Sequence, residues 1–311
     1  MKILITGSNG LLGQKLVYKL KKNKNCICIA TAKGNNRLVS REGYQFESLD
    51  ITDAKNVHEI FSKYLPDVVI NTAAMTNVDA CESEQEACDK LNVIAVKNQV
   101  ACLETLMELN KNYNPHFIQL STDFIFDGTH GPLDELEKPN PLSYYAESKL
   151  KAEEITQHSK LSWSIARTVL VYGIVDNMSR SNIVLWVKSN LEQGKKINVV
   201  DDQFRTPTLA EDLADGCILI AKKRAKGIYN ISGEDFYSIL ELAQIVADYY
   251  KLDKSLINPS KSADIKQPAK RPPITGFIIE KAKRELGYKP HSFTEGIKIM
   301  EQQIEAIHNK G

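Results

Sequence analysis

The sequence predicts an α/β protein: an open, doubly wound parallel sheet with a smaller, mixed lobe toward the C-terminus. Over the first two-thirds of the chain, short apolar runs typical of strands alternate with stretches of helical periodicity. A glycine-rich turn follows the first apolar run, and the pattern becomes more polar and irregular in the last third. A chain of 311 residues is long enough to bury a core in each of about two domains.

Six strand-like runs carry the sheet prediction, at residues 2–6, 26–31, 46–49, 67–71, 116–121 and 163–167. The stretches between them are helical, most clearly 84–109 and 144–157, and leucines at every fourth position from Leu12 to Leu20 mark the first helix face. Strands separated by helices pair in parallel through right-handed crossovers. Near-continuous apolar strands fit a sheet that helices cover on both faces.

The C-terminal third differs from the rest of the chain. Residues 208–211 (TLAE) and 238–241 (SILE) match the capping box of a helix N-terminus. The polar stretch 254–270 is expected to be a loop, and 284–299 a final helix. We expect a larger domain and a smaller lobe with the following bounds: the larger at 1–172 with a return of the chain around 195–230, and the smaller at 173–194 and 231–311.

Charge and composition exclude several classes of function. Lys and Arg number 40 against 39 Asp and Glu, and the resulting net charge of +1 argues against a protein built to bind nucleic acid. No apolar stretch reaches ~18 residues, so we expect no membrane span, and the N-terminus lacks the pattern of a signal peptide. The six cysteines show no C-x-x-C spacing, which predicts reduced thiols in a cytoplasmic protein and no metal site.

Three glycines after the first strand form the pattern G-x-x-G-x-x-G in TGSNGLLG, residues 6–13. One such glycine permits a tight turn, one lets the backbone approach a pyrophosphate, and one lets helix and strand pack closely. The helix that follows presents free amides and its positive dipole end to phosphates. The pattern predicts a Rossmann-type dinucleotide-binding turn, with a glycine-rich turn that binds no ligand as the alternative. The cofactor contacts expected from it are Gly7, Asn9, Gly10, Leu11, Leu12 and Gly13.

The residues after the second strand bear on which dinucleotide binds. A carboxylate there would hold the ribose hydroxyls of NAD, but residues 30–37 (ATAKGNNR) contain no acid. Lys33 and Arg37 could instead contact a 2′-phosphate, which favours NADP, with NAD as the alternative; both cations could equally be solvated. Asp50, at the end of the third strand, is placed to reach the adenine or to cap the next helix. The neighbouring positions Thr31 and Ile51 complete the expected cofactor contacts at this end.

A tyrosine and a lysine four residues apart suggest the chemistry. Tyr145 and Lys149 fall on one face of the helix expected at 144–157. A neighbouring ammonium favours tyrosinate, so we expect a lowered pKa for Tyr145 and a role as general acid toward a carbonyl oxygen. Thr122, at the end of the fifth strand, can offer a hydroxyl to the same oxygen, while a strand-end turn or helix cap is its alternative role.

In their order and spacing, these segments resemble the extended short-chain dehydrogenase/reductase family over nearly the whole chain. Within that family the chain is most similar to the dTDP-4-dehydrorhamnose reductase branch, which reduces nucleotide-linked sugars. The resemblance rests on TGSNGLLG at 6–13, NTAAMTNVDACE at 71–82, STDFIFDG at 121–128, PLSYYAESKLKAE at 141–153, RTVLVYG at 167–173, DDQFRTPT at 201–208 and the RPP that starts at Arg271.

The resemblance implies an NAD(P)H-dependent enzyme that reduces the C4 keto group of a nucleotide-linked 4-keto-6-deoxy sugar, for deoxysugar and surface polysaccharide biosynthesis. It implies that Tyr145 is the general acid, Lys149 its tuner and a ribose ligand, and Thr122 the orienting hydroxyl. It also implies a homodimer. The cofactor groove would include Ala73 and Ala74 at its nicotinamide half. The expected substrate contacts are Thr76, Val78, Asp123, Gln203, Arg205 and Arg271, the last with an exposed surface arginine as its alternative reading.

One position departs from the branch. Its rhamnose-forming members usually carry a tryptophan where this chain has Leu170, so an aromatic platform for the sugar is missing and the sugar stays open. Two alternative functions remain: an epimerase or dehydratase with tightly bound NAD, and a regulatory subunit that binds a dinucleotide without catalysis. The missing acid after the second strand weighs against the first, and the intact Thr122, Tyr145 and Lys149 weigh against the second.

Overall fold

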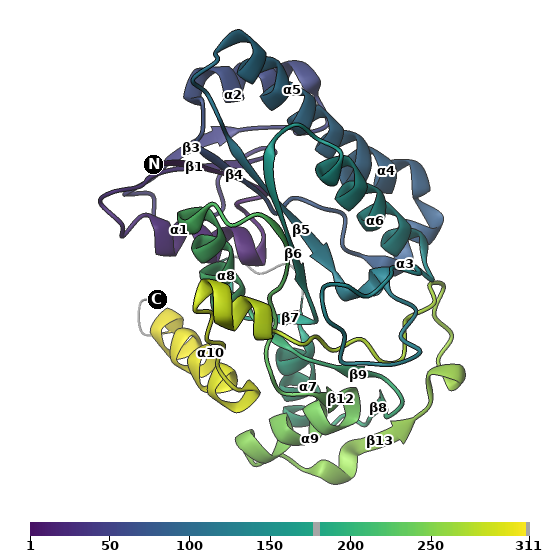
Figure 1. Cartoon of the computed structure of the whole chain (residues 1–311). Helices are drawn as coiled ribbons and strands as arrows, with labels where there is room; N and C mark the ends of the chain where they lie inside the picture. The colour runs from purple at the N-terminus through teal and green to yellow at the C-terminus, as the bar shows by residue number, and fades with distance from the viewer. Residues whose placement is uncertain (177–180, 309–311) are drawn as a thin grey trace.

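A seven-stranded parallel sheet organises the larger domain (Figure 1) of the computed structural model, which describes residues 1–176 and 181–308. The strands stand in the order β11-β6-β5-β4-β1-β2-β3, and each neighbouring pair is parallel. Their bounds are β1 Lys2–Thr6, β2 Ile27–Ala32, β3 Gln45–Ser48, β4 Val68–Asn71, β5 His116–Thr122, β6 Ser162–Thr168 and β11 Gly227–Asn230. The sheet confirms the predicted fold class. The strand order reverses between β1 and β4, the kind of point where open α/β sheets bind ligands.

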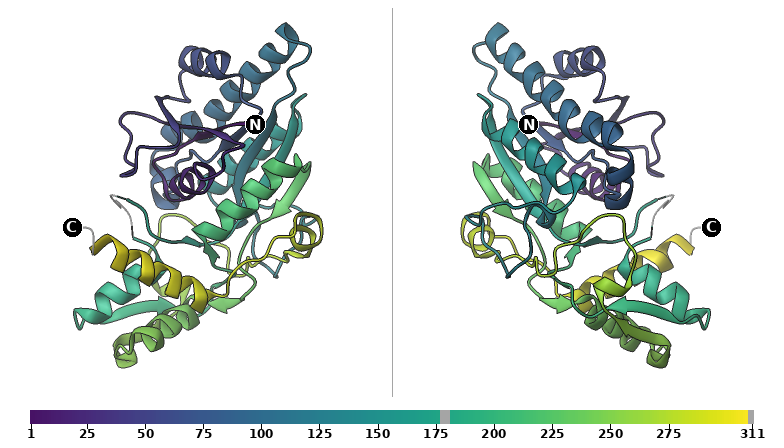
Figure 2. Two further views of the ribbon diagram at one scale, coloured as in Figure 1. Left: turned by 90° about the vertical axis from the view of Figure 1, so that its left-hand side faces the viewer. Right: turned by 90° about the vertical axis from the view of Figure 1, so that its right-hand side faces the viewer.

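Helices cover both faces of the sheet (Figure 2). α1 and α8 pack on one face, over Ile3 and Ile5 of β1, while α2, α5 and α6 pack on the other, over Leu4. Side chains alternate along a strand, so a strand covered on both faces is apolar at every position. The covering helices are α1 Leu11–Leu20, α2 Ala54–Tyr64, α5 Ala95–Leu109, α6 Tyr144–Gln157 and α8 Ala210–Lys223.

The helix expected at 84–109 is present as three successive elements, with a π-helical turn between two α-helical parts. These are α4 Gln85–Asp89, η1 Lys90–Ile94 and α5 Ala95–Leu109. A short helix, α3 Val78–Ser83, precedes them, and a 3-10 turn, η2 Asp123–Ile125, follows β5. In the described part of the chain, no helix is both long enough and apolar enough to cross a membrane.

The smaller lobe has a core of its own, in which α7 and α9 pack on two short strands (Figure 1). β8 pairs with β13 in parallel, β7 pairs with β10 in parallel, and β9 pairs with β12 antiparallel. The bounds are β7 Val171–Tyr172, α7 Ile183–Glu192, β8 Ile197–Val200, β9 Phe204–Arg205, β10 Thr208–Leu209, β12 Tyr237–Ser238, α9 Ile239–Tyr250, η3 Lys254–Leu256, β13 Ile257–Ser260, η4 Ser262–Asp264, η5 Ala282–Leu286 and α10 Phe293–His308.

The segment 195–230, around which the chain was expected to return to the larger domain, divides between the lobes. β8 belongs to the small sheet, whereas α8 and β11 belong to the large domain, where β11 pairs with β6. The chain therefore re-enters the core of the larger domain with α8, which begins at Ala210, directly after β10.

Several local expectations for the last third are wrong. Thr208 caps no helix, because α8 begins at Ala210 and the Thr208 hydroxyl donates to the Val169 carbonyl at 2.6 Å. The stretch 254–270 is not wholly a loop, since it contains β13, and the final helix is α10 rather than 284–299. The capping box of Ser238 and Glu241 is confirmed at the start of α9.

Candidate functional site

A cavity of about 770 Å³ lies at the carboxyl ends of β1, β4 and β5, between the sheet and segments of the smaller lobe. Most of the predicted site residues line it: Asn9, Gly10, Leu11, Leu12, Arg37, Ala74, Thr76, Val78, Thr122, Asp123, Tyr145, Lys149, Gln203, Arg205 and Arg271. The other predicted residues, all in the described part of the chain, do not line the cavity: Gly7, Gly13, Thr31, Lys33, Asp50, Ile51 and Ala73.

The glycine turn brings β1, α1 and the end of β4 together. Gly7 has a φ of +71°, and a Cβ there would lie 2.8 Å from the backbone of Ala73. A Cβ on Gly13 would lie 2.3 Å from the carbonyl oxygen of Gly7. Any larger residue at either position would clash with backbone, so the turn requires both glycines.

The same turn fits a dinucleotide. α1 begins at Leu11, its N-cap residue Gly10 supplies no capping side chain, and Gly10 and Leu11 line the cavity. The first N–H groups of a helix have no partner within the helix, and together with the helix dipole they favour phosphate. The residues present therefore suit a pyrophosphate lying across the start of α1.

Lys33 and Asp50 form an ion pair at the ends of β2 and β3, with 2.7 Å between Nζ and Oδ2. Burial raises the pKa of Asp50, but hydrogen bonds from Lys33 and Thr52 outweigh it and hold that pKa at about 2. The carboxylate that is absent after β2 is thus supplied by Asp50, after β3. A phosphate bound near Lys33 would compete with Asp50 for the Lys33 ammonium. The helix-cap alternative for Asp50 is wrong, because Asp53 caps α2.

Asn9 ties the glycine turn to the segment after β2. Its side-chain amide donates to the carbonyl of Asn35, and its Oδ1 accepts the backbone N–H of Arg37, both at 2.9 Å. The two bonds fix the backbone of Arg37 beside the cavity that its side chain helps to line. Thr31, by contrast, is fully buried and donates to the carbonyl of Ile5.

Tyr145, Lys149 and Thr122 meet where β5 ends against α6. Tyr145 is 8% exposed, and its phenol lies beside the side chain of Thr122. Thr122 also caps η2, because its Oγ1 accepts the N–H of Phe124 at 3.3 Å, and its hydroxyl donates to Asp123 at 3.1 Å. Thr122 therefore has the capping role that its sequence position suggested, and it lines the cavity.

The expectation that Lys149 lowers the pKa of Tyr145 is not met in the structure. Burial raises the pKa of Tyr145 above its ordinary value, opposed by Thr122 and reinforced by Asp123. The Lys149 ammonium donates to the carbonyl of Leu120 at 2.6 Å, and burial lowers its own pKa to about 8. Desolvation dominates both groups, so the phenol keeps the proton that a general acid needs.

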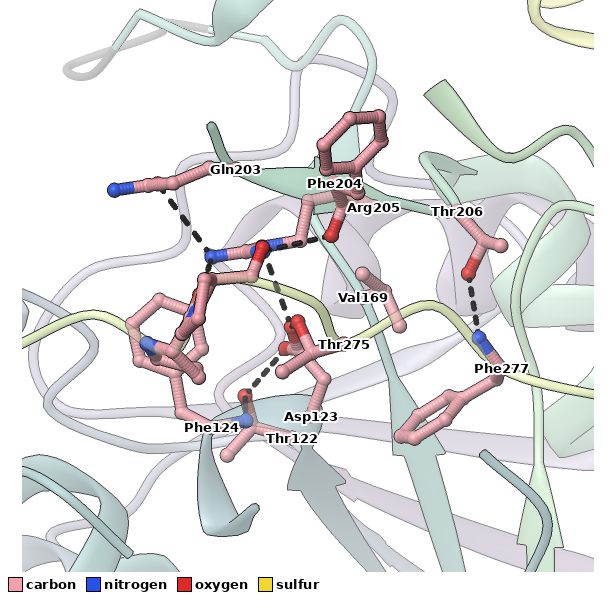
Figure 3. A network of polar contacts seen from close by, with 12 residues as sticks. Thr122, Asp123, Phe124, Val169, Gln203, Phe204, Arg205, Thr206, Thr275 and Phe277 are labelled. Atoms are coloured by element: carbon pink, nitrogen blue, oxygen red, sulfur yellow. Dashed lines mark hydrogen bonds and ion pairs between the residues drawn. The ribbon is translucent and has the colours of Figure 1, made fainter. Parts of the chain in front are cut away.

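Asp123, from the end of β5, and Arg205, from β9, lie close together and both line the cavity (Figure 3). Arg205 Nε lies 3.6 Å from Asp123 Oδ2, and the Thr275 hydroxyl donates to the same oxygen at 2.5 Å. Burial raises the pKa of Asp123, and Arg205 opposes that rise. Arg205 also donates to the carbonyls of Pro272 and Pro273, which joins β9 to the segment before η5.

Gln203 and Arg271 are held by partners from distant parts of the chain. The Gln203 side-chain amide donates to the Ser262 hydroxyl at 2.9 Å. Arg271 pairs with Asp79 of α3 at 2.7 Å, and its side chain is only 19% exposed. The reading of Arg271 as an exposed surface arginine is therefore wrong: it links the smaller lobe to the larger domain at the cavity.

Sequence reasoning missed the segment after β7, which contributes Gly173, Val175, Ser181 and Asn182 to the cavity. Asn182 caps α7 by accepting the N–H of Leu185 at 3.3 Å. An Asn before an apolar helical run is a start signal that could have located this helix. Its position beside the cavity has no local signal, because it depends on how the lobes pack. Among the described residues, no group of three or more His, Cys, Asp or Glu side chains is arranged to hold a metal ion.

Comparison with known proteins places these features in a family. Residues 1–306 match the family described as "RmlD substrate binding domain". The chain belongs to this family. The match to the RmlD family spans both lobes, and it agrees with the resemblance drawn from the sequence motifs.

Two curated relatives show how the RmlD-like fold is used elsewhere. Methionine adenosyltransferase 2 subunit beta of Xenopus tropicalis is 31% identical over 83% of this chain and 75% of its own length. The probable low-salt glycan biosynthesis reductase Agl14 of Haloferax volcanii is 28% identical over 97% of each chain.

Solved structures of similar fold include a dTDP-4-dehydrorhamnose reductase from Clostridium acetobutylicum, with a TM-score of 0.84 and 28% identity over 98% of this chain and all of that one. The dTDP-4-dehydrorhamnose reductase of Bacillus anthracis, in complex with NADP, has a TM-score of 0.81 at 24% identity, covering 97% and 99%. The dTDP-glucose 4,6-dehydratase DesIV of Streptomyces venezuelae, with NAD bound, has a TM-score of 0.80 and 21% sequence identity. The match covers 96% of this chain and 95% of that one. Of these proteins of similar fold, one is therefore solved with NADP and another with NAD.

Proposed function

We propose that the chain reduces the C4 keto group of a nucleotide-linked 4-keto-6-deoxy sugar, with NADPH as the favoured reductant and NADH as the alternative. The observation that carries the proposal is that Tyr145, Thr122 and Lys149 line one cavity with the glycine turn at the start of α1. The proposed acid, the threonine beside it and the proposed phosphate site would thus border one cavity. The family match and the reductases among the similar proteins support the same class of reaction.

The proposed chemistry divides between the cofactor and the chain. A bound nicotinamide dinucleotide supplies a hydride. Tyr145 gives its proton to the carbonyl oxygen as that oxygen gains charge, and burial keeps the phenol protonated until then. Thr122 orients the same oxygen and phenol, and the Lys149 ammonium stabilises the tyrosinate that forms. Closing the cavity from water strengthens each of these interactions.

The substrate is proposed to occupy the part of the cavity toward the smaller lobe. All six of the proposed sugar contacts line the cavity: Thr76, Val78, Asp123, Gln203, Arg205 and Arg271. Leu170 also lines the cavity, so the sugar contacts an aliphatic side chain rather than an aromatic ring. The product class is a deoxysugar donor for surface polysaccharide, made in the cytoplasm by a homodimer.

The direct test follows absorbance at 340 nm with purified protein, NADPH or NADH, and dTDP-4-keto-6-deoxy-L-mannose. Stoichiometric loss of reduced cofactor is expected, faster with NADPH. No loss with this sugar or with related nucleotide-linked keto sugars contradicts the reductase. Extraction of the protein and assay of the released nucleotide then separates the alternatives, because tightly held NAD would indicate an epimerase or dehydratase.

A second candidate function is favoured by one observation: a relative at 31% identity is a subunit of methionine adenosyltransferase. Under that alternative the chain binds a dinucleotide and regulates a partner without turning over a sugar. Dinucleotide binding by calorimetry, together with no turnover on any keto sugar, would support it. Turnover that Tyr145→Phe abolishes would exclude it.

A further inference from the structure

α6, the helix that carries the tyrosine and lysine of the site, also holds one partner of a buried ion pair. Glu153 follows Lys149 by one turn of α6, and its two carboxylate oxygens accept from Nε and Nη2 of Arg167 at 2.9 and 2.7 Å. The side chains are 0% and 2% exposed. A bidentate pair with both partners removed from water is costly to form and fixes both side chains in one geometry.

The pair is built into the same strands that form the site. Arg167 is the β6 partner of Ser121 on β5, one residue before Thr122. The Lys149 ammonium donates to the carbonyl of Leu120, one residue further back. Lys149 and Arg167 therefore place two cations in one buried layer between α6 and the sheet, and Glu153, on the same helix as Lys149, is paired with Arg167 in it.

We propose that Glu153 is a positioning residue for Lys149, whose ammonium it keeps charged beneath the cavity, and that Arg167 holds Glu153 in place for this role. The inference rests on the proposed function for its effect on turnover. Its claim about the charge of Lys149 concerns the chain alone and can be tested without cofactor or sugar.

The electrostatics around Lys149 support this role. Burial lowers the pKa of Lys149 to about 8, and Glu153 is the largest influence opposing that fall, followed by Cys88 of α4. The ionisable groups that act on the neighbouring Tyr145 are Asp123 after β5, Cys81 on α3 and Cys88 on α4. Burial raises the pKa of Asp123 and of Cys81, which favours their neutral forms, so Glu153 is the acidic side chain best placed to oppose the loss of the Lys149 proton.

Loss of the Glu153 charge should therefore turn Lys149 into a neutral amine near neutral pH. The test measures the pKa of Lys149 directly, by 13C NMR of the intact protein labelled at the lysine ε-carbons. The Lys149 signal is assigned by its loss in Lys149→Met. In Glu153→Gln, which keeps the size of the side chain, we expect the titration midpoint to fall by about one unit or more, and in Glu153→Asp to stay close to that of the native protein.

A double variant separates charge from stability. Glu153→Gln leaves Arg167 buried without its anion, so its melting temperature should drop, whereas Glu153→Gln with Arg167→Met removes both charges and should recover much of that loss. The Lys149 midpoint should fall furthest in Glu153→Gln, and the double variant, which also removes the Arg167 cation, should recover only part of that fall. A midpoint that matches the native protein in Glu153→Gln, or that recovers fully in the double variant, overturns the proposal.

If the protein turns over sugar, the alkaline limb of its pH–rate profile should shift down in each variant by the same amount as the Lys149 midpoint of that variant. Normal midpoint shifts without turnover in the native protein would leave the role of Glu153 standing and count against the reductase instead. Turnover by the native protein, with no shift of the Lys149 midpoint in Glu153→Gln, would support the reductase and overturn the role of Glu153.

Discussion

At the scale of single residues, two adjacent tyrosines have different surroundings. Tyr145 lies at the cavity with its ring edge-on to Phe124, whereas the Tyr144 hydroxyl donates to Asp89 at 2.8 Å. Neighbouring positions on a helix point about 100° apart, so only one of the two can face the site. The spacing of four to Lys149 selects Tyr145, and the structure places that residue at the cavity.

Replacement of Tyr145 by Phe should lower turnover by roughly 10²–10⁴, the usual contribution of a general acid. Cofactor affinity should hardly change, because Phe fills the same space without the hydroxyl. Tyr144→Phe is the matched control and should keep near-native turnover. Steady-state rates and cofactor titrations on the two variants check this, and native-like turnover in Tyr145→Phe would remove the proposed acid.

The double variant Lys33→Ala with Arg37→Ala should weaken NADPH binding more than NADH binding, since a 2′-phosphate would lose both cations. Lys33 is 79% exposed and paired with Asp50, so the loss should be larger at low salt. The exposed Lys24→Ala on the same domain serves as control. Equal weakening of both cofactors, measured by fluorescence titration, would show that these cations do not select a phosphate.

At the scale of elements, the turn between β1 and α1 depends on atomic clearance. At Gly7 the backbone is left-handed, and a Cβ added by Gly7→Ala would also clash with the backbone of Ala73. Gly194 has a similar φ of +67°, but no atom lies within 4 Å of the Cβ that Gly194→Ala adds. We expect Gly194→Ala to lower the free energy of unfolding by about 1–2 kcal/mol, and Gly7→Ala by about 1–3 kcal/mol more. Gly7→Ala should also abolish dinucleotide binding. Urea denaturation of both variants tests the difference, which equal losses would contradict.

The opposite end of the sheet should make the fold sensitive to acid. Burial lowers the pKa of His116 on β5 to about 4 from 6.5, with Arg224 and Lys226 adding to the effect. The unfolded chain then binds more protons below pH 6.5, so the free energy of unfolding should fall by about 3 kcal/mol between pH 6.5 and 4. His116→Gln should lose most of this dependence, and the exposed His58→Gln should keep it. Urea denaturation at a series of pH values measures this dependence. If the free energy of unfolding of His116→Gln falls with pH as it does in the native protein, His116 is not its cause.

The elements that could be predicted are those with a strong local pattern. Six of the seven strands of the large sheet follow from the predicted runs, whereas β11 was not among them. α6 and the capping box at Ser238 follow from periodicity and spacing. β13 was missed, because a polar four-residue strand with a proline, Pro259, has no apolar run and forms only against β8. Thr208 matched a capping pattern, but its hydroxyl is taken by the Val169 carbonyl.

At the scale of the whole molecule, the site is made where two lobes meet, and this limits what the sequence can reveal. Motifs placed Tyr145, Lys149 and the glycine turn at the cavity. The pairs Lys33–Asp50, Asp79–Arg271 and Asp123–Arg205 join residues far apart in the chain. No local pattern encodes such pairs, so the charge state of Lys149 and the engagement of Arg271 emerge only from the folded chain.

The central claim is that this cavity delivers a hydride and a proton to a sugar carbonyl. The most direct measurement uses NADPH deuterated at nicotinamide C4 with a nucleotide-linked 4-keto-6-deoxy sugar, and examines the product by NMR and mass spectrometry. The account predicts one deuterium at C4 of the sugar and one NADP formed per product, with Tyr145→Phe slowing both equally. Product without deuterium, or conversion of the sugar with no net oxidation of the cofactor, would contradict it.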